Sequence, residues 1–402
     1  PHGKRGLYTS FIQTTATLGL FLSLLVILGC RMALGNETFE DWGWRIPFLV
    51  SIVLLGISVW IRLQLSESPL FQQMKAEGKG SKKPFRDSMK GGNLGLMLLV
   101  LLGATAGQAV VWYGGQFYSL FFLTQALKVD GTTANLLIAA ALALATPFFI
   151  VFGWLSDKIG RKKIILAGCF LAAVTYFPIF KGLTHFANPG VEEARQNAPA
   201  VVHADPATCS FQFDPIGKKV FTNSCDIAAA ALAKAGIPYE IVPAAPGTVA
   251  RISVGGTDVE AYDAAGLSKE EVSSRAAAFT GLLKSTLASA GYPDKADPDR
   301  INIPGTLFLL WVLVIYVTMV YGPIAAYLVE LFPTRIRYTS MSLPYHIGNG
   351  WFGGFLPTIS FALVAATGNM YFGLWYPIGI AIMTVIVGGL FLRETKDDDI
   401  SK

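Results

Sequence analysis

Charged residues are scarce in this chain of 402 residues. Asp, Glu, Lys and Arg together make up 15% of it, whereas hydrophobic residues make up 52%. Soluble domains carry about 25% charged residues, so this composition argues against a soluble protein and indicates a membrane protein. The formal net charge of +5 does not indicate nucleic-acid binding, because the cations cluster in short loops between apolar runs.

Catalytic and phosphate-binding motifs are also missing. The sequence has no G-x-x-x-x-G-K-[ST] loop, which argues against an ATP-driven pump, and no nucleophile elbow or paired His ligands. Asp294, Asp297 and Asp299 resemble a calcium-binding cluster only faintly, since the Gly and the closing Glu of an EF-hand loop are absent. We therefore expect no enzyme activity, no cofactor and no metal site.

Long apolar runs are abundant. Eight of them are long enough to cross a hydrocarbon core, which takes about 20 helical residues. They lie near residues 8–33, 45–65, 94–126, 132–155, 163–181, 304–331, 339–366 and 371–392. The third run is long for a single span, and we expect it to tilt or break at Gly114-Gly115.

The distribution of basic residues predicts the orientation of these spans. The turn from Asp157 to Lys163 is rich in Gly and cations, so it must lie at a membrane surface, and its charge places it on the cytoplasmic side. Basic clusters around Lys4, Lys79 and Arg335 fall on the same side when the spans alternate, and the loops between them are acidic or nearly neutral. The pattern predicts a multi-pass protein of the cell (inner) membrane with both termini of this chain cytoplasmic.

Residues 182–303 interrupt the pattern with a polar, Pro-rich stretch that has no span-length apolar run. We expect a small extracytoplasmic soluble insertion with an α/β or α fold. A capping box at Ser268 predicts a helix that ends at Gly291, a second helix is expected between Asp226 and Gly236, and residues 249–254 are a candidate strand. Cys209 and Cys225 lie on the oxidising side and are expected to form a disulfide, the alternative being two buried thiols.

Several motifs taken together resemble a known family. They are Arg5-Gly6 with Gln13 in the first span, Glu67-Ser68-Pro69 after the second, the turn from Asp157 to Lys163, and the run from Glu330 to Arg337. Their order resembles the major facilitator superfamily, and within it the metabolite:H+ symporter family, which includes transporters of shikimate, proline and betaine, and 2-oxoglutarate. The resemblance implies an all-α membrane bundle in which this chain supplies helices 5 to 12 of twelve. The long insertion between the ninth and tenth helices departs from the family pattern.

The resemblance also implies a division of the chain into parts. We expect the last two helices of the N-terminal half, a cytoplasmic loop between the halves, three helices of the C-terminal half, the insertion, the last three helices and a cytoplasmic tail. In that order, these parts are residues 1–69, 70–93, 94–181, 182–303, 304–393 and 394–402.

Charged side chains at the cytoplasmic ends of the spans are candidate gating residues. They are Arg5, Glu67, Asp157, Arg161, Glu330, Arg335 and Arg337. Ion pairs near the low-dielectric core exceed fully exposed pairs in energy, and a network that forms only when one side is closed would bias alternating access. The alternative is that the cations serve only as topology signals.

Polar side chains inside the spans are candidate substrate contacts, because a polar group that faces lipid is costly. Gln108, Trp112 and Gln116 are spaced by four and share one helix face. The full set of candidates is Gln13, Gln108, Trp112, Tyr113, Gln116, His346 and Asn349. The alternatives are interhelical hydrogen bonding for the Gln residues and a neutral hydrogen-bonding role for His346, which would otherwise relay a proton.

These observations favour a secondary active transporter that couples uptake of a small organic acid or zwitterionic metabolite to protons. Its expected partners are the metabolite, protons and the lipid bilayer, with no nucleic acid, and we expect a monomer. In the family, proton coupling is usually assigned to acidic residues of first-half helices that this chain lacks. The rival hypothesis is a membrane sensor on a transporter scaffold, with a ligand bound by the insertion.

Overall fold

The computed structural model describes residues 3–210 and 219–399. Among these residues, eight helices are long and apolar enough to cross a membrane, which confirms the predicted number of spans. They run over Arg5–Leu34 (α1), Arg45–Gln64 (α3), Gly92–Ala126, Gly131–Ile159, Arg161–Ala187 (α11), Ile303–Leu331, Arg337–Thr367 and Phe372–Phe391. The fifth span is longer than the apolar run predicted, because the polar residues after position 181 continue the same helix.

The composite spans consist of shorter helical elements. The third comprises α6 (Gly92–Val100), η2 (Leu101–Thr105), α7 (Ala106–Tyr113), η3 (Gly114–Tyr118), α8 (Ser119–Phe121) and η4 (Phe122–Ala126). The fourth comprises α9 (Gly131–Ala145) and α10 (Pro147–Ile159), and the sixth α15 (Ile303–Tyr321) and α16 (Ile324–Leu331). The last two comprise α17 (Arg337–Ile347), η6 (Gly348–Gly353), α18 (Leu356–Thr367), η7 (Phe372–Leu374) and α19 (Trp375–Phe391). Short helices outside the spans are α2 (Asn36–Thr38), η1 (Phe39–Gly43), α4 (Pro69–Ala76) and α5 (Pro84–Ser88).

The third span does not break at its two glycines. It widens there into a π-helical turn, η3, which keeps the helix continuous. Gly115 faces α15 so closely that an added Cβ would lie 2.7 Å from Cγ2 of Val317 and 3.0 Å from the Leu313 carbonyl oxygen. The glycine therefore serves close packing between two spans, and π-turns of this kind are frequent at functional sites.

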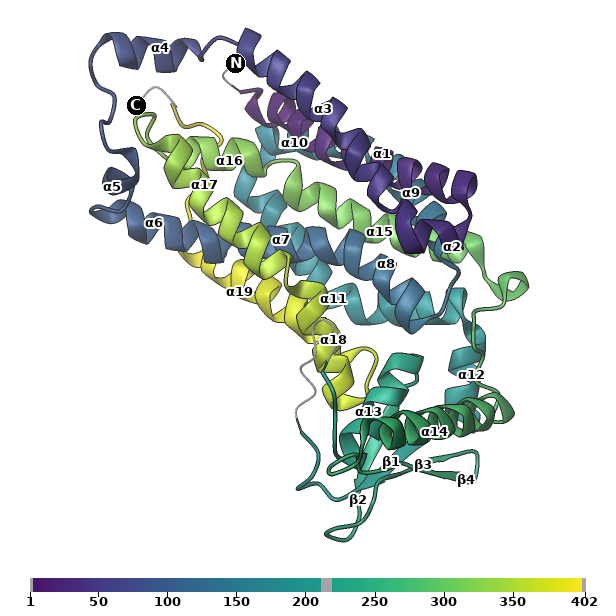
Figure 1. The fold of residues 1–402 in the computed structure, drawn as a ribbon. Coiled ribbons are helices and arrows are strands. Elements are labelled where there is room, and N and C mark those ends of the chain that lie inside the picture. Colours follow the sequence, from purple (N-terminus) through teal and green to yellow (C-terminus); the bar gives the residue numbers. More distant parts are fainter. Residues whose placement is uncertain (1–2, 211–218, 400–402) are drawn as a thin grey trace.

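The bundle has one continuous apolar core. The fifth span, α11, packs against α15 and α19, while α15 also contacts α7 and α9. Helix α1 packs along α10, and α3 contacts α1 at the edge of the bundle (Figure 1). Helix α3 has no buried residue although its sequence is strongly apolar, as expected of a surface that faces lipid or other helices.

Between the fifth and sixth spans the chain forms a small α/β domain. Its elements are α12 (Pro189–Asn197), β1 (Ala200–Ala204), α13 (Ser224–Ala235), β2 (Tyr239–Pro243), β3 (Arg251–Val254), β4 (Thr257–Glu260), α14 (Lys269–Ser289) and η5 (Pro298–Arg300). The sheet order is β2-β1-β3-β4, with β1 parallel to β2 and the other pairs antiparallel. A core of its own, which includes Val202, Leu232, Ile252 and Phe279, joins the sheet to α13 and α14.

Two helix ends in this domain follow the predicted signals, but α13 starts earlier than predicted, at Ser224 with Asn223 as its cap, and not after Asp226. Ser268 and Glu271 form a reciprocal capping box at the start of α14, which satisfies two backbone amides. Helix α13 ends at Gly236, whose φ of 74° lies in the left-handed region that favours glycine. Cys209 and Cys225 are joined as a disulfide with a Cα to Cα distance of 5.3 Å. The domain lies at one end of the bundle, and both termini lie at the other (Figure 1).

Candidate functional site

A buried charged cluster lies at the end of the bundle opposite the insertion. Its centre is Arg161, the first residue of α11, which is completely buried. The guanidinium donates to Asp157 Oδ1 at 2.8 Å and to Glu330 Oε1 at 3.1 Å, and it also reaches Ser156 Oγ at 3.2 Å. Both carboxylates are as buried as the arginine. The cluster therefore links α10, α11 and α16 through fully desolvated charges.

Helix α1 joins this cluster in two ways. Arg5 Nη1 lies 3.0 Å from Glu330 Oε1, so two arginines share one carboxylate. Asp157 accepts hydrogen bonds from the backbone amides of Gly6 at 2.9 Å and Leu7 at 2.8 Å. Those amides belong to the first turn of α1 and lack partners within the helix, so the carboxylate caps the helix and complements its dipole.

The segment after the last span also forms hydrogen bonds with the cluster. Glu394 accepts from the backbone amides of Arg161 at 2.8 Å and Lys162 at 3.2 Å, so it caps the start of α11. Thr395 Oγ1 donates to Glu330 Oε2 at 2.7 Å, and Arg5 donates to the Asp398 carbonyl at 2.8 Å. The sequence analysis missed these residues. The charged run that directly follows the last apolar segment was the available signal.

Three of the predicted gating residues lie outside this cluster. Glu67 is exposed after α3. Arg335 is exposed and lies near Asp87, whose pKa is lowered first by a hydrogen bond from Ser81 and in smaller part by Lys90 and Arg335. Arg337 is half-buried and donates to the Phe332 carbonyl at 2.9 Å. Sequence position at a helix end does not determine which side chains turn inward, because that depends on the packing of neighbouring helices.

A polar and aromatic face lies within the third span. Gln108 and Gln116 are buried, with exposed fractions of 0% and 1%. Gln108 forms a reciprocal amide pair with Asn349 of η6, with N to O distances of 3.2 and 3.3 Å, and Asn349 also donates to the Tyr345 carbonyl at 2.9 Å. Two predicted contact residues from different spans are thus brought together.

Trp112 lies on the same face, between Gln108 and Gln116. Its ring contacts Tyr113 at 4.9 Å and Tyr321 at 5.9 Å between centroids. The indole Nε1 and both amide atoms of Gln116 are buried without a hydrogen-bond partner among the described residues. Unpaired buried polar groups cost about 1–3 kcal/mol each, so they mark positions where a ligand would supply the missing partner.

The remaining two candidates differ in their surroundings. Gln13 of α1 is 5% exposed and lies one helical turn from Ser10, which faces α10. His346 of α17 is exposed, and its ring contacts Tyr345 edge to face at 5.6 Å between centroids. The structure therefore buries Gln13 within the bundle and leaves His346 exposed.

Comparison with known proteins finds similarity to one family over the first part of the chain. Residues 1–186 match the model of the Major Facilitator Superfamily, and the matched part ends where α11 ends and the insertion begins. This part of the chain is also similar to metabolite transporters. No solved structure matches the chain significantly.

Its relatives are named as transporters. An alpha-ketoglutarate permease of Escherichia coli (strain K12) is 29% identical over 46% of this chain and 42% of the permease. A shikimate transporter from the same organism is also 29% identical, over 46% of this chain and 42% of the transporter. A Haemophilus influenzae protein named "Putative metabolite transport protein" is 27% identical over 99% of this chain and 65% of that protein. The chain thus spans less than two thirds of the length of these relatives.

Proposed function

We propose that this chain forms part of a secondary active transporter that moves a small organic acid or zwitterionic metabolite by alternating access, coupled to protons. The buried charged cluster carries the proposal. It joins α1 to α10, α11, α16 and the segment after α19, and its central charges, those of Asp157, Arg161 and Glu330, are buried. Carriers of this superfamily rock one bundle of helices against the other, and such motion needs an element with two discrete arrangements.

The cluster has the energetics of such an element. A buried ion pair compensates roughly for its own desolvation when intact, but it costs about 3–5 kcal/mol when one partner is lost. Intact, it stabilises the arrangement in which α1 lies against α10. When the helices separate, water enters and the charges are solvated individually. We propose that this end is cytoplasmic and that the cluster closes the cytoplasmic gate.

The proposed substrate site is the face formed by Gln108, Trp112, Gln116 and Asn349, with Tyr113 beside it. The amide pair and the unpaired Gln116 amide offer both donors and acceptors, and the aromatic rings offer an apolar and π surface. None of the described side chains in this group is charged. This chemistry favours zwitterions or weak acids, which aromatic and amide groups bind without a cationic anchor.

Reconstitution tests the proposal. The full-length protein in vesicles with an imposed pH gradient should accumulate a labelled organic acid or zwitterion from a panel of candidates. Trp112→Ala and Gln116→Ala should each weaken its affinity by about 1–3 kcal/mol, the cost of an unpaired buried partner or a lost aromatic contact. Gln73→Ala, an exposed glutamine of α4, is the matched control. Unchanged affinity in both span variants would remove this face from the site.

The sensor hypothesis makes the opposite prediction. A receptor on a transporter scaffold would bind its ligand without accumulating it, whatever the pH gradient. The folded core of the insertion keeps this second function open. Accumulation that collapses with a protonophore would favour the carrier over the sensor. A single protomer per functional unit is part of the carrier proposal.

A further inference from the structure

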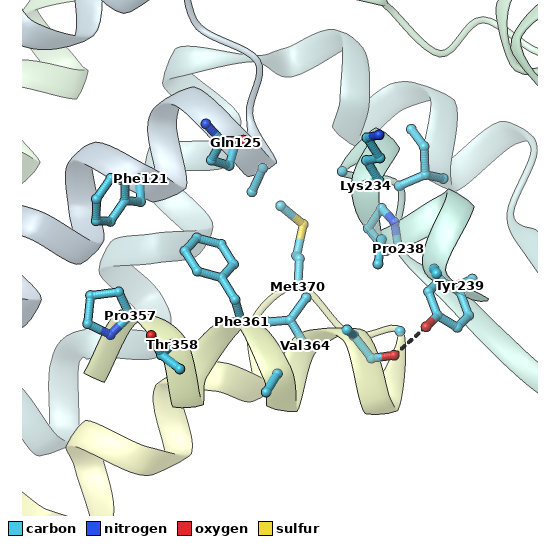
Figure 2. Close-up of a pocket in the computed structure, with 18 of the residues that line it drawn as sticks. Phe121, Gln125, Lys234, Pro238, Tyr239, Pro357, Thr358, Phe361, Val364 and Met370 are labelled. Atoms are coloured by element: carbon cyan, nitrogen blue, oxygen red, sulfur yellow. Dashed lines mark hydrogen bonds between the residues drawn. The ribbon is translucent and has the colours of Figure 1, made fainter. Parts of the chain in front are cut away.

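A cavity lies where the insertion meets the bundle. Its volume is about 770 Å³, within the range of small-molecule sites. One wall comes from the ends of the third and seventh spans, with Phe121 and Phe361, and the other comes from α13 and β2, with Lys234 and Tyr239 (Figure 2). Neither the bundle nor the insertion forms this cavity alone. It is also separate from the face around Trp112, since none of the residues of that face lines it.

Hydrogen bonds to backbone carbonyls join the two parts at and near the cavity. The Tyr239 amide donates to the Gly368 carbonyl at 2.9 Å, and the Tyr239 hydroxyl donates to the Ala365 carbonyl. Gly368 has a φ of 68°, and a Cβ there would collide with the Tyr239 carbonyl oxygen. Asn188 Nδ2 donates to the Leu127 carbonyl at 2.8 Å. The cavity is therefore preformed, so little ordering would oppose ligand binding.

The lining combines an apolar interior with positive charge. Phe121, Phe361 and Met370 lie on one side of the interior, and the Lys234 side chain lies at the opposite wall (Figure 2). Lys219 also lines the cavity, with its ammonium 5.1 Å from the ring centre of Phe221. No Asp or Glu occurs among the described lining residues.

A third lysine, Lys128, contacts the backbone of one lining residue but does not itself line the cavity. Lys128 Nζ donates to the Lys234 carbonyl at 3.1 Å, which satisfies an acceptor at the C-terminal end of α13. Burial lowers the pKa of Lys128, with a smaller opposing effect from Asp294. A partly desolvated ammonium attracts an anion more strongly than a solvated one does.

We propose that this cavity binds a small organic anion with an apolar body. The apolar part would lie against Phe121 and Phe361, and the anionic group would face Lys219 and Lys234. The inference concerns a second site, outside the membrane-spanning face of the proposed carrier, and gives the insertion a role in ligand capture. An uncharged or cationic compound of the same shape lacks the complementary charge.

Equilibrium binding of a fluorescent probe tests the inference without transport. The full-length protein in detergent would be titrated with 2-naphthoate, and with the neutral 2-naphthalenemethanol as the charge control. We expect saturable naphthoate binding at least tenfold tighter than that of the alcohol. Lys219→Ala combined with Lys234→Ala should weaken naphthoate binding at least tenfold, while the pair Lys269→Ala and Lys284→Ala, on α14, should change it less than twofold.

A second variant removes the apolar contact and leaves the charges in place. Phe361→Ala should weaken both probes, and a thermal melt of each variant would confirm that it is folded. Equal binding of naphthoate and the alcohol would overturn the inference, as would retention of naphthoate binding in the Lys219 and Lys234 double variant. If Trp112→Ala abolished naphthoate binding instead, the probe would occupy the membrane face and the inference would also be overturned. Failure of uptake would refute only the carrier.

Discussion

Replacing Arg161 by Ala should open the proposed cytoplasmic gate. The change removes the only side chain that contacts both Asp157 and Glu330 among the described residues. Breaking a buried ion pair costs about 3–5 kcal/mol. For Arg161→Ala we expect a cost near the lower end of this range, because Glu330 keeps its contacts with Arg5 and Thr395 and Asp157 keeps its hydrogen bonds from two backbone amides. A cost of about 3 kcal/mol corresponds to a shift of roughly 100-fold in the population with α1 separated from α10.

Accessibility of a buried position on α1 measures this shift. Ser10 is completely buried against α10, so a Ser10→Cys thiol would react with a maleimide only while the helices are apart. Cys30 and Cys169, the free cysteines, would be replaced first. In the Arg161→Ala background the labelling rate from the proposed cytoplasmic side should rise by roughly 100-fold, provided that opening and closing are fast relative to labelling.

Arg62→Ala is the matched control for this experiment. Arg62 lies near the end of α3, on the side predicted to be cytoplasmic, but is exposed. Its loss should leave the rate within about twofold, because exposed charges contribute little. A melting temperature for each variant separates gate opening from global unfolding. If Arg161→Ala left the labelling rate unchanged in folded protein, the cluster would not hold α1 against α10.

Three further predictions concern orientation, the disulfide and pH. Single cysteines at the exposed positions Lys79 and Thr257 should label from opposite sides of the membrane, and labelling of both from one side would refute the topology. Replacing Cys209 and Cys225 by Ser should destabilise the insertion by about 3 kcal/mol, because in the chain-entropy model the bond closes a loop with a separation of 16 residues. Detection of two free thiols in the native protein would exclude the bond. Hydrogen bonds from the backbone amides of Gly247 and Ala207 lower the pKa of Asp205. The ionised Asp205 carboxylate therefore stabilises the folded state above about pH 4, and this stabilisation is lost as the pH falls through the lowered pKa. A melting series from pH 6 to pH 3 should therefore fall less steeply for Asp205→Asn, and equal slopes would contradict the assignment.

The parts of the fold that the sequence predicts are those with a local signal, such as an apolar run, a capping box or a glycine at a helix end. The spans follow from apolar length, and α14 follows from its capping box at Ser268. Helix α13 ends at Gly236 as predicted, because the left-handed backbone conformation of this glycine terminates the helix. The pairing of β1 with β2 in parallel was not predictable, because the partner strands are far apart in sequence and neither alternates regularly in polarity.

The sites were less predictable because they depend on contacts between distant segments. Arg161 and Glu330 could be proposed as partners from charge and position, yet the capping of α11 by Glu394 spans 233 residues and leaves no periodic signal. Side-chain direction was equally undetermined. His346 and Gln13 are both polar residues within apolar spans, but one is exposed and the other is buried. Only the packing of neighbouring helices distinguishes them.

Glycine gives the charged cluster its dependence on helix separation. An added Cβ at Gly153 would lie 2.5 Å from Cβ of Ser10, and one at Gly6 would lie 2.4 Å from the Gly153 carbonyl oxygen. The backbones of α1 and α10 therefore touch at this point, as small residues permit between membrane helices. That contact is what brings the amides of Gly6 and Leu7 within hydrogen-bonding distance of Asp157. Close backbone packing has little tolerance for partial separation, so we expect the capping bonds and the helix contact to form or break together. The two-state behaviour that the proposed gate requires would then follow from the backbone geometry as much as from the charges.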